Sequence, residues 1–268
     1  MANSDDSLVE LVRQEVFSDF LDRVVTVDYY VPARKWWQFW KRPYVILFHD
    51  GQDLDRMNFL EIYRRTFQNS GATKPLVVAI HANEDRMREY GTAAQTDYAG
   101  RGDRAHLHER FVLEELLPAV QSAHRTHRRV AVAGFSLGGL AAFDLAWRNP
   151  RTFHRVGVFS GALWWRSQAF NPAAPDDHLI VHEMVKSTPA VSRQQKFWFQ
   201  TGTLDETDDR NNNGIIDSID DTLHLIRCLN ERGYKTGTDI EYLEVEGGRH
   251  DVPTWTGVMP EFLGWLVR

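Results

Sequence analysis

The sequence predicts an α/β fold in which a mostly parallel sheet is covered by helices on both faces. Short apolar runs alternate along the chain with longer segments of helical spacing, which is typical of strand–helix–strand units. The runs are apolar almost without interruption, as expected of strands that are buried on both faces. The chain has 268 residues without an internal repeat or low-complexity linker. We therefore expect one α/β domain over residues 1–268.

The expected elements follow one another in regular order. Residues 24–31 alternate between polar and apolar side chains, which predicts a half-exposed strand that Pro32 ends. Six compact apolar runs are expected to form buried strands: residues 44–49, 76–81, 130–135, 156–160, 197–200 and 240–245. Five segments have helical spacing: residues 57–68, 106–125, 137–149, 221–232 and 255–267. The aromatic segment 34–42 is interpreted as a connection that packs on the sheet edge, with a substrate or partner surface as the alternative.

The composition excludes several classes of protein. Apolar residues make up 43% and charged residues 25% of the chain, which is typical of a soluble globular protein. The 31 Lys and Arg against 37 Asp and Glu give a net charge of −6, which argues against general nucleic-acid binding. No apolar run approaches the ~20 residues of a membrane helix, and the N-terminus lacks the features of a secretory signal. The single cysteine, Cys228, cannot form an internal disulfide. These features predict a cytoplasmic enzyme.

A candidate nucleophile lies between the run 130–135 and the helical segment after it. Gly134-Phe-Ser136-Leu-Gly138 matches the Gly-x-Ser-x-Gly pattern, in which the serine occupies a sharp turn from strand to helix. The glycines are needed because side chains there would collide with neighbouring segments. The helix that begins after Ser136 directs N–H groups at negative charge that develops in a reaction. Ser136 is therefore the expected nucleophile.

A nucleophilic serine needs a base, and the base needs an acid that orients it. In the fold that uses this turn, the chain order is serine, acid, histidine. His250 lies in a glycine-rich segment after the last expected strand and is the expected base. Asp205 follows the strand before it and is the expected acid, with Glu206 and Asp208 as alternatives. Four histidines before the nucleophile are expected at the surface or an interface: His106, His108, His124 and His127.

At this point the chain resembles the putative-esterase branch of the α/β-hydrolases, which includes proteins similar to feruloyl esterases, enterochelin esterases and S-formylglutathione hydrolases. The resemblance extends from about residue 24 to residue 266. It is carried by Tyr44-Val-Ile-Leu-Phe-His-Asp-Gly-Gln52, Tyr98-Ala-Gly-Arg-Gly-Asp103, Phe111-Val-Leu-Glu-Glu-Leu-Leu-Pro118, Gly134-Phe-Ser-Leu-Gly-Gly139, Phe159-Ser-Gly-Ala-Leu-Trp-Trp165, Gly202-Thr-Leu-Asp205 and Gly248-Arg-His-Asp251. It implies the α/β-hydrolase fold and the same Ser136–Asp205–His250 triad.

The resemblance also implies an activity. It suggests a serine esterase that forms an acyl-enzyme on a small-molecule ester and needs no cofactor for catalysis. The oxyanion donors that it implies are the backbone N–H groups of Gln52 and Leu137. Trp164 and Trp165 follow a strand end and are candidates for the wall of a substrate pocket. Acyl transfer on the same scaffold and a non-catalytic binding domain remain as alternatives, and the oligomeric state is not predicted.

A polar insertion at residues 205–220 interrupts the alternation of strands and helices. Its last twelve residues match the calcium loop of helix–loop–helix proteins, with oxygen-bearing residues at positions 1, 3, 5, 7, 9 and 12 and glycine at position 6. The candidate ligands are Asp209, Asn211, Asn213, the carbonyl of Ile215, Asp217 and Asp220. Aspartate at position 12 makes the segment similar to a dockerin-type loop. The sequence therefore predicts a structural Ca²⁺ site, with a metal-free polar turn as the alternative.

Overall fold

The computed structural model describes residues 9–33, 42–68, 70–71, 73–189 and 195–268. The aromatic connection expected at residues 34–42 lies outside these residues, apart from Arg42. Among the helices in the described ranges, none is long and apolar enough to cross a membrane.

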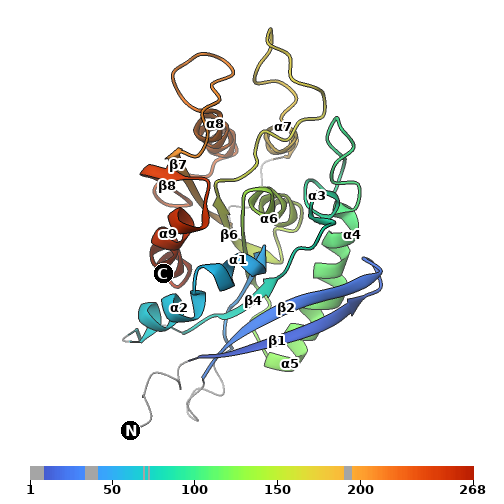
Figure 1. Ribbon diagram of the computed structural model, residues 1–268, viewed down its shortest axis with the longest axis vertical. Coiled ribbons are helices and arrows are strands. Elements are labelled where there is room, and N and C mark those ends of the chain that lie inside the picture. The colour runs from blue at the N-terminus through green and yellow to red at the C-terminus, as the bar shows by residue number, and fades with distance from the viewer. Residues whose placement is uncertain (1–8, 34–41, 69, 72, 190–194) are drawn as a thin grey trace.

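Eight strands form one sheet in the order β1-β2-β4-β3-β5-β6-β7-β8 (Figure 1). The strands are β1 (Val9–Ser18), β2 (Arg23–Pro32), β3 (Val45–His49), β4 (Leu76–Ile80), β5 (Val130–Phe135), β6 (Phe153–Phe159), β7 (Lys196–Leu204) and β8 (Ile240–Arg249). The pairs β1–β2 and β2–β4 are antiparallel. The neighbours from β4 through β8 are parallel. The expected α/β-hydrolase fold with a mostly parallel central sheet is confirmed.

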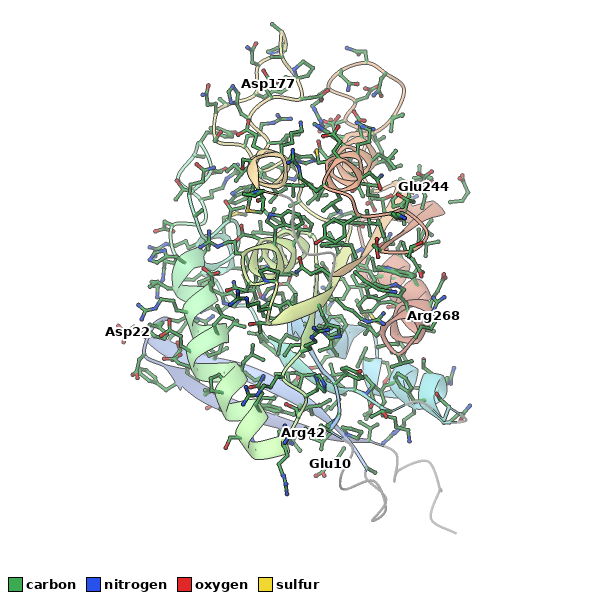
Figure 2. The ribbon with its side chains drawn as sticks, turned by 180° about the vertical axis from the view of Figure 1, so that it is seen from behind. Glu10, Asp22, Arg42, Asp177, Glu244 and Arg268 are labelled. Atoms are coloured by element: carbon green, nitrogen blue, oxygen red, sulfur yellow. The ribbon has the colours of Figure 1, made fainter. Side chains whose placement is uncertain are left out.

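Helices cover both faces of the sheet. They are α1 (Gly51–Arg56), α2 (Phe59–Phe67), α3 (Arg86–Glu89), α4 (Ala105–Arg110), α5 (Leu117–His124), α6 (Leu137–Arg148), α7 (Ile180–Ser187), α8 (Asp217–Glu231) and α9 (Val252–Leu266). A π-helical stretch, Phe111–Leu116, joins α4 to α5. Apolar side chains of α1, α2 and α9 form one core with the sheet. Those of α5, α6, α7 and α8 form the other core, and Figure 2 shows these helices in front of the sheet.

The central strands contribute to both cores in alternation. In β3, Val45 and Leu47 belong to the core under α6, whereas Ile46 and Phe48 belong to the core under α9. All five residues of β3 are buried. This explains the unbroken apolar runs in the sequence, because neither face of such a strand meets water.

Several elements differ from the expected ones. Strand β1 was not expected, and neither were α1, α3 and α7. Helix α8 begins at Asp217, four residues earlier than expected, and β8 continues to Arg249 through its glycines. The single helix expected at residues 106–125 contains the π-helical stretch, which precedes Pro118. Proline has no N–H to donate to the preceding turn, which favours such an irregularity.

Parallel strands bring their carboxyl ends to one edge of the sheet. There, Asp50 follows β3, Ser136 follows β5, Ser160 follows β6, Asp205 follows β7 and His250 follows β8. This edge is where α/β folds place their ligands.

Candidate active site

Ser136 occupies a strained turn between β5 and α6. Its backbone has φ 55° and ψ −120°, a conformation that side chains other than glycine rarely adopt. A Cβ atom at Gly134 would lie 2.3 Å from the carbonyl oxygen of Gly138, so Gly134 cannot carry a side chain. The N–H of Ser136 donates to the carbonyl of Phe159, and the Ser136 carbonyl accepts from the N–H of Ala162. Contacts from β6 and the loop after it therefore hold the strained residue in place.

A second strained turn lies beside the first, at the end of β3. Asp50 is left-handed, with φ 60° and ψ 48°, and it precedes the short helix α1. A Cβ atom at Gly51 would lie 2.7 Å from the carbonyl carbon of Ala79, so only glycine fits there. The side chain of Gln52 accepts from the N–H of Ala82 and donates to Asp50. The backbone of Gln52 is thus fixed next to the nucleophile turn.

The two turns make direct contact. A Cβ atom at Gly138 would lie 2.4 Å from Oδ2 of Asp50, so this glycine lets the two turns approach closely. Arg86 donates from Nε and Nη2 to the two carboxylate oxygens of Asp50, both at 2.7 Å. Arg86 also donates to the carbonyl of Phe135, at 3.4 Å.

Two buried histidines are hydrogen-bonded to each other, and one of them bonds to the nucleophile turn. His49 Nδ1 lies 3.1 Å from the carbonyl oxygen of Gly138. Because a carbonyl only accepts, the proton of neutral His49 is on Nδ1, and Nε2 accepts from Nε2–H of His108 at 3.1 Å. His108 was expected at the surface or an interface and is instead buried, because α4 packs its inner face against the end of β3. Burial lowers the pKa of His49 to about 4 and that of His108 well below its usual value.

The carboxyl group of Asp205 is buried at the end of β7, and neither oxygen has a hydrogen-bond partner among the described residues. Burial raises its pKa, whereas the Gly202 N–H, the Ser160 hydroxyl and His250 lower it. Glu206, the alternative acid, instead accepts from the N–H of Ser218 near the start of α8. Asp208 is exposed. Of the three candidate acids, Asp205 is the one whose charge acts on the pKa of His250.

His250 follows β8 and reaches solvent at the sheet edge. Its ring meets Trp255 edge-on, with 5.5 Å between the ring centroids. Trp255 stacks on Phe135, the neighbour of Ser136, and its indole N–H donates to the Ser160 hydroxyl. Partial desolvation lowers the pKa of His250 most, Asp205 and Asp251 raise it, and Arg86 lowers it.

The structure thus gathers the expected Ser136, Asp205, His250, Gln52 and Leu137 at one edge of the sheet. Sequence reasoning missed the residues that connect them, among which are Asp50, Arg86, Ser160 and Trp255. In the sequence, Trp255 only begins the expected helical segment 255–267, and Asp50 lies within the motif of residues 44–52. The pairing of Asp50 with Arg86 joins residues far apart in sequence and leaves no local pattern.

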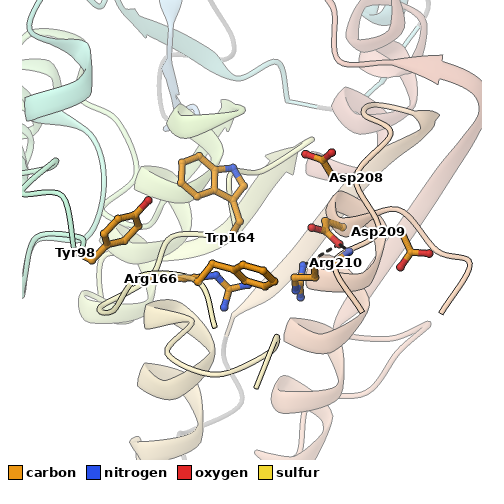
Figure 3. A pocket seen from close by; sticks show the side chains of 8 residues that line it. Tyr98, Trp164, Arg166, Asp208, Asp209 and Arg210 are labelled. Atoms are coloured by element: carbon orange, nitrogen blue, oxygen red, sulfur yellow. Dashed lines mark hydrogen bonds and ion pairs between the residues drawn. The ribbon is translucent and has the colours of Figure 1, made fainter. Parts of the chain in front are cut away.

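A cavity of about 410 Å³ lies between the segment before α4 and the segments that follow β6 and β7. It is lined by Tyr98, Trp164, Arg166, Phe170, Asp208, Asp209, Arg210 and Asp217 (Figure 3). Trp164 is 40% exposed, and Arg101 lies over its ring. Trp165 is fully buried and packs under Gly91 and Gly102, so of the two tryptophans only Trp164 reaches the cavity. Ala162, two residues before Trp164, donates to the Ser136 carbonyl, so the backbone connects one wall of the cavity to the nucleophile turn, although Ser136, Asp205 and His250 do not line the cavity.

The polar segment after Asp205 folds as a closed loop. Asp209 accepts from the N–H groups of Asn213 and Gly214, and Gly214 has φ 85°. The side-chain amides of Asn211 and Asn213 both donate to Asp220. Arg210 contacts Asp217 through its N–H and its guanidinium. Asp209, Asn211, Asn213 and Asp220 are thus linked by hydrogen bonds within one loop. Asp217 is instead paired with Arg210.

The carboxylates of this loop do not form a compact cluster. Among the described residues, the group of three acidic or histidine side chains with ligand atoms within 4.8 Å of one another is Asp28, Asp55 and His81. The guanidinium of Arg13 already fills that group, because it bonds to both Asp28 and Asp55.

Comparisons with known proteins agree with the α/β-hydrolase fold. Residues 18–266 match the family described as Putative esterase. A ferulic acid esterase structure has 17% identity and a TM-score of 0.71, with 97% of this chain and 98% of that chain covered. The enterobactin esterase of Shigella flexneri has 19% identity and a TM-score of 0.70, covering 95% of this chain and 58% of that one. An IroE-like serine hydrolase from Shewanella oneidensis has 19% identity and a TM-score of 0.70, covering 96% and 80%. A search of curated proteins gave no match.

The buried His49 predicts a specific loss of stability in acid. Its folded-state pKa of about 4 lies below the ordinary value of 6.5, so the unfolded chain binds the proton first as the pH falls. Stability is therefore lost from about pH 6.5 down to about pH 4, by about 1.4 kcal/mol per pH unit. Asparagine can keep the donor to Gly138 without titrating. We expect His49→Asn to flatten the pH dependence of the free energy of unfolding by up to this slope, as measured by urea titrations at several pH values.

The matched control is His106→Asn, on the exposed side of α4. It should leave the slope as in the wild type. An unchanged slope in His49→Asn would mean that His49 does not contribute to acid sensitivity.

Proposed function

The chain belongs to the putative esterase family of the α/β-hydrolases and is an ester hydrolase, and we propose that Ser136, His250 and Asp205 form its catalytic triad. The observation that carries the proposal is the strained backbone of Ser136 between two glycines that cannot bear side chains. Strain of this kind persists only where surrounding contacts impose it, and it is concentrated at functional sites. It presents the hydroxyl at the head of α6, beside the turn of Gln52.

The proposed reaction assigns a role to each of these groups. The hydroxyl of Ser136 attacks the ester carbonyl while His250 takes its proton, and Asp205 accepts a hydrogen bond from the imidazolium. The N–H groups of Gln52 and Leu137 stabilise the oxyanion. His250 then returns the proton to the leaving alcohol, and a water molecule, activated by the same histidine, cleaves the acyl-enzyme. Two observations support the role of Asp205: its carboxyl oxygens are buried, and its charge raises the pKa of His250.

We place one side of the ester in the cavity next to Ser136. The aromatic rings of Tyr98, Trp164 and Phe170 are each at least 40% exposed there. Exposed rings around one cavity favour an apolar or aromatic group of the substrate. Trp164 is the substrate-binding residue of this proposal, and Trp165 supports it from the core.

We expect Ser136→Ala to lower kcat for a p-nitrophenyl ester by more than about 10⁴-fold, because the nucleophile is lost. The melting temperature should hardly change, since the side chain contributes little to the core. A fluorophosphonate probe should label Ser136 in the wild type and in the control Ser187→Ala, whose serine is exposed on α7. Labelling of another residue, or turnover in Ser136→Ala close to that of the wild type, contradicts the mechanism.

The choice between the two neighbouring acids can be tested separately. Asp205→Asn should lower kcat/KM by about 10²- to 10⁴-fold, since an amide neither orients nor stabilises the imidazolium correctly. Because Asp205 raises the pKa of His250, the acid limb of the rate profile should move to lower pH. Glu206→Gln should change kcat/KM only a few-fold, because Glu206 bonds to α8. The reverse order of effects would assign the role to Glu206.

We also propose that the loop of residues 209–220 binds Ca²⁺ for a structural purpose. Its ligands would be Asp209, Asn211, Asn213, Asp220 and the carbonyl of Ile215, which form the oxygen-only set that calcium prefers. Asp217 can join them only if its contacts with Arg210 loosen. Bound calcium would order the segment that follows Asp205 and that lines the cavity.

Removal of calcium should therefore lower the melting temperature, and added calcium should restore it. Asp209→Ala should be insensitive to both treatments, whereas the neighbouring control Asp208→Ala should respond as the wild type does. Differential scanning calorimetry on protein verified to be metal-free measures both effects. Identical melting curves with chelator and with millimolar calcium would exclude the site.

A further inference from the structure

We propose that Arg86 is a positioning residue of the active site, which clamps Asp50 so that the turn of Gln52 is held against the turn of Ser136. The inference rests on the esterase function proposed above and assigns a role to a side chain outside the triad. Arg86 would set the separation between the two oxyanion donors without donating to the oxyanion itself.

Asp50 is held by hydrogen bonds through both its carboxylate and its backbone N–H. Its carboxylate is 1% exposed and takes two parallel bonds from the guanidinium of Arg86. Its backbone N–H donates to the hydroxyl of Tyr90, and Oδ1 also accepts from the Gln52 side chain. Asp50 has to be held this firmly because its left-handed backbone is unfavourable for a residue with a side chain. The held residue directly precedes Gly51 and Gln52, so its orientation fixes the direction of the Gln52 N–H.

The same cluster also holds the nucleophile turn from both sides. Oδ2 of Asp50 lies against the α-carbon of Gly138, and His49 donates to the Gly138 carbonyl. Arg86 reaches the carbonyl of Phe135, the residue before Ser136. Phe135 and Gly138, which lie on either side of Ser136, are therefore both linked to Asp50. Neither turn can move by a fraction of an ångström without breaking a buried contact.

Helix α3, which carries Arg86, is itself held by a buried ion pair. Arg86 begins α3, and Glu89 at the end of α3 is buried and paired with Arg23 of β2. The Arg86 side chain is 30% exposed and lies over the ring of Tyr90. A planar guanidinium suits this place, because only arginine offers two parallel donors to one carboxylate.

Arg86 has a second, electrostatic effect that a purely structural residue would lack. The charged groups that act on His250 are Asp205 and Asp251, which raise its pKa, and Arg86, which lowers it. Removal of the positive charge should therefore raise the pKa of His250. Lysine at this position keeps the positive charge but not the two parallel donors, so it should leave the pKa of His250 near its wild-type value.

The closing experiment compares Arg86→Met, Arg86→Lys and the control Arg88→Met. Arg88 lies on the same helix, is half exposed and pairs with Asp103 at the surface. We expect Arg86→Met to lower kcat by about 10²- to 10³-fold, the effect of a lost oxyanion donor, with KM changed only a few-fold. The acid limb of its rate profile should move to higher pH. Arg86→Lys should lose most of kcat but keep the acid limb, and Arg88→Met should resemble the wild type in both.

A second measurement does not depend on turnover. Amide hydrogen exchange at residues 51–54 and 136–140 should become faster in Arg86→Met than in Arg88→Met. Arg86→Met leaves the Asp50 carboxylate buried without its partner, so the double variant Asp50→Asn/Arg86→Met should regain stability but not kcat. Wild-type kcat in folded Arg86→Met or Arg86→Lys overturns the proposal, and so does unchanged exchange in both segments. Failure of the esterase function itself would show separately, as a wild-type protein that neither turns over esters nor reacts with the fluorophosphonate.

Discussion

The contact between Asp50 and Gly138 is the constraint on which the site depends. A methyl group at Gly138 would collide with the Asp50 carboxylate, so only glycine allows the two turns, which follow different strands, to pack directly against each other. Both turns contain residues with positive φ, Asp50 and Ser136, and isolated peptides would not keep these conformations. The sheet edge, covered by helices on both faces, supplies the rigidity that keeps them.

Two buried ion pairs flank the turn of Gln52. Asp50 is paired with Arg86 on one side of the Gln52 turn. On the other side, Asp28 is fully buried and accepts from Arg13 and His81. His81 also packs against Gly51, and the N–H of the next residue holds the Gln52 side chain. Since a buried ion that loses its partner is strongly destabilising, these pairs resist any rearrangement of the turn.

The cavity depends on a third cationic side chain. Arg210 bonds to Pro175 and Asp176 in the loop before α7, and to Asp217 and Asp221 in α8. Figure 1 shows these two loops rising side by side at the same end of the molecule. Arg210 therefore joins the two loops that wall the cavity. Order in the polar loop and the shape of the cavity are physically coupled through this one side chain.

The sequence alone predicted the sheet strands from β2 to β8 and the candidate nucleophile, acid and base, because each follows from a local pattern. An unbroken apolar run marks a doubly buried strand, and the glycines around Ser136 mark a turn without room for side chains. Strand β1 lies at the edge of the sheet, where mixed exposure blurs the alternation, and it escaped prediction. The tertiary structure decided that His108 is buried, that Trp164 rather than Trp165 reaches the cavity, and that Arg86 meets Asp50. These outcomes depend on contacts between segments far apart in the chain, and a local sequence pattern contains no information about such contacts.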